Sequence, residues 1–136
     1  MPRLQVETTY GAAKREAYKQ LRAFNARAAS KMVFKPVAVT LRERGKVVGM
    51  LTGETYWSWF SIDALWIAEA YRGKGHGKAL LEKAEGEARK HGARHAFVNS
   101  FSFQAPGFYR KLGYREFGRL DDFPAGHSRS WLTKAL

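Results

Sequence analysis

The sequence predicts a mixed α/β fold (the α+β class) in a single domain that covers residues 1–136. Three observations support this class. The chain length is ordinary for one domain, helical and strand-like hydrophobic periods alternate along it, and no repeat, low-complexity tract or linker interrupts them. A chain of this size can bury a hydrophobic core without disulfides or metal ions to hold it together.

The first half predicts one helix followed by strands. Residues 10–29 form an amphipathic helical pattern that Thr8 or Thr9 could cap, and residues 4–8 could form a short strand before it. Residues 37–43 alternate apolar and polar side chains, and the pattern resumes at 47–51 after a turn at 44–46, which predicts an antiparallel hairpin. Residues 57–69 predict a further strand, and Gly53 to Thr55 predict a bend or bulge before it.

The second half alternates helices and strands. An apolar stripe predicts a helix from about Gly77 to Lys90, which Gly92 ends. Residues 94–100 predict a strand, and Pro106 begins a short helix that Gly113 ends. Residues 114–120 and 127–136 predict two closing strands joined by a loop.

The composition excludes several kinds of partner and several kinds of catalytic chemistry. The net charge is +12, and it is spread evenly: residues 1–68 carry 11 basic and 5 acidic groups, and residues 69–136 carry 13 and 7. Because no segment concentrates the charge, a nucleic-acid partner is not expected. The chain has no cysteine, which excludes disulfides and thiol catalysis, and its histidines lack metal-ligand spacing, so no metal is expected. No membrane-length apolar run or signal core is seen, which predicts a soluble, cytoplasmic protein.

A glycine-rich basic turn precedes the second helix. Gly73, Gly75 and Gly77 alternate with Lys74 and His76 between a predicted strand and this helix. Glycines let backbone N–H groups approach an anion, and a helix N-terminus attracts one. The turn therefore predicts a phosphate or pyrophosphate site. Its spacing matches neither the Walker A nor the dinucleotide-binding pattern.

Two motifs in order resemble the GCN5-related N-acetyltransferase (GNAT) superfamily. Residues 72–77, RGKGHG, fit its R/Q-x-x-G-x-G/A signature, and residues 104–118, QAPGFYRKLGYREFG, fit its A-x-x-x-Y-x-K-x-G-[FY] segment. The resemblance covers about residues 36–136. It implies a mixed, mostly antiparallel sheet flanked by helices, acetyl-coenzyme A as cofactor, and a small bacterial protein. Ser102 stands where many members carry an asparagine, and Asn99 could replace it. Ser102 could equally be a helix N-cap.

The resemblance also implies site residues. Tyr109 matches the general acid that protonates the leaving thiolate, and the backbone near Trp66 or Ile67 would bind the oxyanion. The base is open between Glu54, Asp63, His127 and a water chain. The cofactor-binding set comprises Leu65, Trp66, Ile67, Arg72, Gly73, Lys74, Gly75, His76, Gly77, Lys78, Asn99, Ser102, Ala105, Phe108, Tyr109 and Lys111.

The sequence predicts the class of the acetyl acceptor but not its identity. Its binding set comprises Phe24, Asn25, Trp57, Trp59, Asp121, Asp122 and His127, which suits a small primary amine. The net charge would suit an amine that carries a carboxylate. A protein or peptide acetyltransferase acting on a lysine or an N-terminus, and a non-catalytic acyl-CoA-sensing module, are the alternatives. The resemblance also leaves a homodimer possible.

Overall fold

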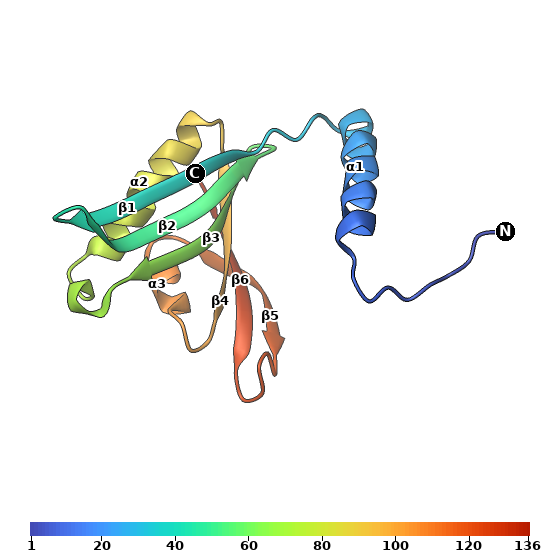
Figure 1. The fold of residues 1–136 in the computed structure, drawn as a ribbon. Helices are drawn as coiled ribbons and strands as arrows, with labels where there is room; N and C mark the ends of the chain where they lie inside the picture. Colours follow the sequence, from blue (N-terminus) through green and yellow to red (C-terminus); the bar gives the residue numbers. More distant parts are fainter. The chain divides into compact units, whose positions relative to one another are not determined.

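The computed structural model describes all residues from 1 to 136 as two compact units, Met1–Met32 and Val33–Leu136. The element order is α, three strands, α, strand, α and two strands, which matches the sequence prediction except for the strand expected at 4–8 (Figure 1). That the two units form a single domain stays a prediction. None of the helices is long and apolar enough to cross a membrane.

The first unit consists of one helix and its flanking segments. Helix α1 spans Gly11–Ala28, and residues 1–10 have no regular structure, so the strand expected at 4–8 is absent. No side chain caps the helix, so neither Thr8 nor Thr9 has the expected role. A five-residue segment without sheet partners has nothing to pair its backbone with, and it cannot form a strand alone.

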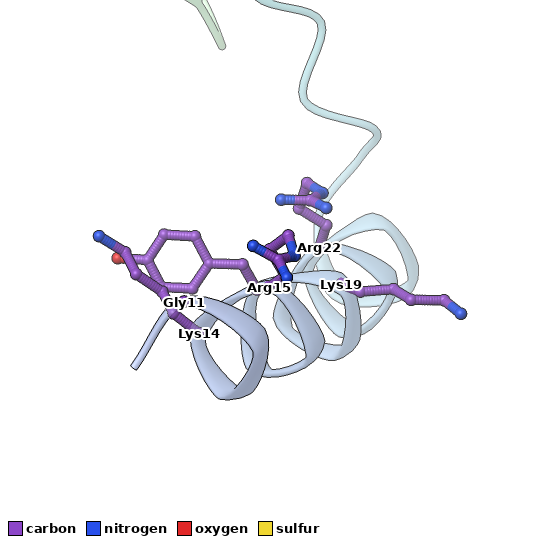
Figure 2. Close-up of a pocket in the computed structure, with 6 residues that line it drawn as sticks. Gly11, Lys14, Arg15, Lys19 and Arg22 are labelled. Carbon is purple, nitrogen blue, oxygen red and sulfur yellow. The ribbon is translucent and has the colours of Figure 1, made fainter. Parts of the chain in front are cut away.

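Helix α1 has two distinct faces. Ala13, Ala17, Leu21 and Phe24 lie on one side at helical spacing, and the helix buries none of its residues. A shallow groove on the other side is lined mostly by basic side chains (Figure 2): Gly11, Lys14, Arg15, Tyr18, Lys19 and Arg22.

The second unit is a six-stranded sheet with helices. The strands are β1 (Lys35–Glu43), β2 (Lys46–Tyr56), β3 (Trp59–Ile67), β4 (His95–Phe101), β5 (Arg115–Asp121) and β6 (Ser128–Ala135). Their order is β1-β2-β3-β4-β6-β5, and only β3 and β4 are parallel (Figure 1). A 3₁₀ turn, η1 (Glu69–Tyr71), precedes α2 (His76–Lys90), and α3 (Pro106–Lys111) follows β4. The mixed, mostly antiparallel sheet flanked by helices is thus confirmed.

The turn between β2 and β3 differs from the sequence prediction. Strand β3 begins at Trp59, because Trp57 and Ser58 form the turn with φ of 46° and 65°. Such a left-handed pair is the geometry that a two-residue hairpin turn requires. Residues 53–55 do not break β2, which runs without interruption to Tyr56.

The core lies between α2 and one face of the sheet. Leu80, Leu81, Ala84 and Ala88 of α2 belong to the same buried cluster as residues from β1, β2, β3, β4 and β6. In β4 the residues Ala96, Val98 and Ser100 are buried, whereas the alternate residues Phe97, Asn99 and Phe101 are only half-buried. The alternate residues therefore define a second face of the sheet, which we call the open face.

Candidate active site

Strands β3 and β4 part from each other in the middle of the sheet. They pair only at Trp59–His95, Phe60–Ala96 and Ser61–Phe97. Beyond Ser61 the β3 backbone keeps its antiparallel partner β2 but has none on the β4 side. The facing edges beyond this point form the walls of a gap, which we call the splay. Unpaired edges of this kind offer backbone N–H and C=O groups to an extended ligand.

The glycine-rich turn stands at the end of the β3 wall. The first helical hydrogen bond of α2 joins Ala79 N to Gly75 O at 3.1 Å, and the N–H groups of residues 73–78 donate to no backbone carbonyl. Gly73 and Gly75 have φ of 71° and 82°, and a Cβ on either would extend into open space. Six N–H groups without backbone acceptors at a helix N-terminus, with open space beside Gly73 and Gly75, fit the diphosphate of a coenzyme A derivative.

The third glycine of the turn has a different role. A Cβ on Gly77 would lie 3.1 Å from the Phe108 ring of α3, so a larger residue here would require that ring to shift. This close approach joins the first turn of α2 to α3. Arg72, at the start of the turn, donates through Nε to the Ile67 carbonyl at 2.9 Å, which holds the turn against the end of β3. The side chains of Lys74 and Lys78 are exposed.

Tyr109 follows Phe108 on α3. Its ring is only 7% exposed and packs edge-on against Tyr114 at 5.7 Å. Burial raises the pKa of Tyr109 to about 12. The Tyr109 hydroxyl makes no hydrogen bond within the protein. Every fully buried polar side-chain atom of the structure has a hydrogen-bond partner, so this hydroxyl must be accessible to solvent. Tyr109 therefore holds its proton at neutral pH and is free to donate it.

The two candidate carboxylates lie near the start of the splay. Glu54 pairs across the sheet with Ser61, the last β3 residue that pairs with β4, and is exposed. Glu54 is therefore not buried against the aromatic residues that surround it in the sequence, Tyr56, Trp57 and Trp59. Asp63 is the extra residue of a β-bulge, because Thr52 pairs with Ala64 and Gly53 pairs with Ile62. The bulge expected near Gly53 thus lies on the opposite strand. Bulges of this kind redirect side chains beside active sites.

Asn99 and Ser102 have protein partners. The side-chain oxygen of Asn99 accepts a 2.8 Å hydrogen bond from Arg129 Nε. Ser102 is not the N-cap of α3, which is Ala105. Instead the Ser102 hydroxyl accepts the backbone N–H of Ser128 at 3.0 Å and lies 3.4 Å from His127 Nδ1. Ser102 thus fastens the end of β4 to the start of β6, a tertiary contact that local sequence does not reveal.

The residues predicted to bind the acceptor lie on several separate elements of the structure. Trp59 stacks on His95 at 4.7 Å where β3 and β4 pair, and Trp57 lies in the preceding turn. The remaining residues occupy α1 (Phe24, Asn25), the last position of β5 (Asp121) and the loop from β5 to β6 (Asp122, His127). Asp121 pairs with Arg119 at 2.9 Å, and the His127 ring stands edge-on to Phe103 at 5.1 Å.

Sequence reasoning missed an aromatic cluster beside His127. Phe101 stacks on Phe103 at 5.3 Å and contacts Phe123 at 5.6 Å. Arg129 lies among these rings with Trp131. The available signal was the density of phenylalanine in residues 101–103 and 123, on two segments that β4–β6 pairing brings together.

The chain belongs to the acetyltransferase (GNAT) family, whose model matches residues 3–114. The protein is therefore an acetyl-CoA-dependent N-acetyltransferase. It is 40% identical to a blasticidin-S acetyltransferase of Streptomyces morookaense over 69% of this chain and 70% of the relative. It is 35% identical to an acetyltransferase of Agrobacterium fabrum over 71% of each chain. A crystal structure of a Bacillus cereus acetyltransferase superposes with a TM-score of 0.91 at 34% identity over 98% of both chains.

Proposed function

We propose that this enzyme transfers the acetyl group of acetyl-CoA directly to the primary amine of a small molecule. The observation that carries the proposal is the contact between Gly77 and Phe108. Through it the first turn of α2, which follows the free N–H groups of the glycine turn, packs against α3, which carries Tyr109. The relative that acts on blasticidin S supports a small-molecule acceptor.

The residues of the splay have separable roles in this proposal. The N–H groups of residues 73–78, with Arg72, Lys74 and Lys78, would hold the diphosphate, and residues 65–67 would pair with the pantetheine arm. Asn99, Ser102, Ala105, Phe108 and Lys111 complete the cofactor-binding set. Acetyl-CoA supplies the activated acetyl thioester. The backbone N–H near Trp66 or Ile67 stabilises negative charge on the carbonyl oxygen. Tyr109 gives its proton to the departing sulfur.

The amine must lose a proton before it attacks. Glu54 and Asp63 both lie near the start of the splay, and the register places Glu54 in the same row across the sheet as Ser61 and Phe97. We propose Glu54 as the base, acting directly or through water. Glu54→Gln should lower kcat about 100-fold, within the range for general bases, and leave the Kd for CoA unchanged. Asp63→Asn is the matched comparison; a larger loss of kcat in that variant would give the role to Asp63.

Binding of the cofactor is tested by calorimetric titration with CoA. Gly75→Val adds a side chain where the diphosphate would lie, and we expect at least tenfold weaker binding, since one charged hydrogen bond contributes about 1.5–3 kcal/mol. Gly45→Val is the matched control. Gly45 has φ of 80°, against 82° for Gly75, with no atom near its Cβ position, so both variants strain the backbone alike. Equal CoA affinity in the two variants would remove the diphosphate site from the turn.

The acceptor class is tested by following release of free thiol from acetyl-CoA. A panel of small primary amines is compared with peptides that carry a lysine or a free N-terminus. Turnover of the small amines alone supports the proposal. Turnover restricted to the peptides would establish a protein or peptide acetyltransferase instead.

We further propose that the protein forms a homodimer that covers the apolar side of α1. Within the first unit, Leu21 and Phe24 form an apolar stripe on α1, and a helix by itself has nothing to cover such a stripe. Strand β6 lies between β4 and β5, so the C-terminal strand offers no free edge to a second copy. Light scattering should give twice the 15.4 kDa chain mass, and Leu21→Glu with Phe24→Glu should halve that value. A monomeric wild-type protein would contradict the proposal.

A further inference from the structure

Arg129 lies on the open face of the sheet inside a cage of aromatic rings. Its guanidinium carbon is 4.9 Å from the centre of the Phe101 ring, 5.1 Å from Phe123 and 5.0 Å from Trp131. Its Nε donates to the side-chain oxygen of Asn99 at 2.8 Å. Three rings and one hydrogen bond fix the plane of the guanidinium, so it is held in place before any ligand arrives.

The charge of Arg129 is not balanced by a carboxylate of the protein. The salt bridges of the structure involve other residues, and the nearby Asp121 pairs with Arg119 at 2.9 Å. Only Nε has a hydrogen-bond partner, which leaves both terminal nitrogens free to donate. A half-buried charge without a counter-ion is unfavourable, and a fixed guanidinium fork matches the two oxygens of a carboxylate.

Arg129 lies close to the place where the acceptor would bind. Arg129 pairs with Phe101 and Trp131 pairs with Asn99 across β4 and β6, and all four lie on the open face. Phe101 and Asn99 belong to the part of β4 that borders the splay. Arg129 is therefore one strand, about 5 Å, away from that gap. The opposite face of the sheet is filled by the core beneath α2, so the open face is the side on which an acceptor can approach.

We infer that Arg129 binds the carboxylate of the acceptor, so that the substrate is an amine that also carries an acid group and an apolar or planar body. This inference rests on the proposed function for its reaction, and Arg129 determines the specificity of that reaction. Phe101, Phe123 and Trp131 contact the body of the acceptor, while Asn99 orients the guanidinium. The amine then extends from Arg129 across β4 towards the splay.

The test uses two amines that differ only in the acid group, 4-(aminomethyl)benzoate and 4-(aminomethyl)benzamide. Each is titrated into ¹⁵N-labelled protein saturated with CoA, and the Nε–H resonance of Arg129 is followed, identified by its loss in Arg129→Lys. We expect the benzoate to shift this resonance and to bind at least tenfold more tightly than the benzamide. Arg129→Met should abolish the preference and leave the Kd for CoA unchanged. Arg89→Met, which changes an exposed arginine of α2, should keep the preference.

Several results would overturn the inference. These are equal affinity for the two amines, an unshifted Arg129 resonance, or a preference that survives in Arg129→Met. Inorganic phosphate that displaces the benzoate at equal concentration would assign the site to a phosphate instead of a carboxylate. Failure of the proposed function is distinguishable, because it appears as absent CoA binding or thiol release while the response of Arg129 to the benzoate persists.

Discussion

The hydroxyl of Tyr114 donates a 2.7 Å hydrogen bond to the carboxylate of Glu85, a residue of α2 that is only 3% exposed. Lys134 of β6 donates to both oxygens of the same carboxylate at 3.1 and 3.0 Å. Three segments that are distant in the chain therefore meet at one buried charge. This contact joins α2, the segment between α3 and β5, and the last strand.

Removal of this carboxylate should destabilise the second unit strongly. Glu85→Ala leaves the Lys134 ammonium, which is 24% exposed, without a partner and the Tyr114 hydroxyl buried without an acceptor. Breaking such a buried pair costs about 3–5 kcal/mol of unfolding free energy. Urea unfolding measures this loss. Glu82→Ala, in the same helix, removes an exposed partner of Lys78 and should change stability by less than about 1 kcal/mol. Similar losses in the two variants would contradict a special role for Glu85.

The same buried tyrosines predict how stability depends on alkaline pH. Burial raises the pKa of Tyr109 to about 12, and burial with the Glu85 hydrogen bond raises the pKa of Tyr114 further. Above pH about 10 the unfolded chain loses these protons while the folded protein keeps them, so stability falls as pH rises, by up to about 1.4 kcal/mol per pH unit for each group. Below pH about 9 neither tyrosine contributes a slope.

Urea unfolding between pH 9 and 11 measures this slope. In Tyr109→Phe the fall of the unfolding free energy with pH should be less steep, because only Tyr114 still contributes to it. An identical slope in wild type and Tyr109→Phe would show that Tyr109 ionises as readily in the folded protein as in the unfolded chain.

The sequence allowed the order of elements and the glycine turn to be predicted because both depend on local signals. Hydrophobic periodicity places α2, and the turn predicted before it is present, with positive φ at Gly73 and Gly75. The position of Asp63 in a bulge and the end of β3–β4 pairing after Ser61 depend on sheet register. Register is set by partners distant in the chain, which a single sequence does not specify.

The cage around Arg129 was unpredictable for the same reason. Asn99 and Arg129 are 30 residues apart and meet only because β6 inserts between β4 and β5. The sequence showed that basic residues exceed acidic ones and suggested an acceptor with a carboxylate, but it could not distinguish Arg129 from the other basic residues. Only the packing of three rings around one guanidinium singles it out.

Tyr109→Phe should separate catalysis from cofactor binding. The substitution removes only the hydroxyl, so the ring that packs against Tyr114 stays in place. Loss of a general acid should lower kcat about 10²- to 10⁴-fold, while the Kd for CoA changes little. Because the pKa of Tyr109 is raised to about 12, the wild-type kcat should show no loss of the acid up to pH about 10. An unchanged kcat in Tyr109→Phe would move the proton-donor role to another residue or to water.

Two glycines of α2 should respond in opposite ways to alanine. At Gly77 a new methyl group would lie 3.1 Å from the Phe108 ring, so Phe108 must move, and overpacking of this kind costs about 1–3 kcal/mol. At Gly86 no atom lies near the new methyl group, so Gly86→Ala should raise stability by up to about 1 kcal/mol through helix propensity. Thermal unfolding measures both changes. Calorimetry should also show a severalfold higher Kd for CoA in Gly77→Ala alone, because its ring contact joins the turn to α3. Stabilisation in both variants, with unchanged CoA affinity, would mean that the Gly77–Phe108 contact does not position the site.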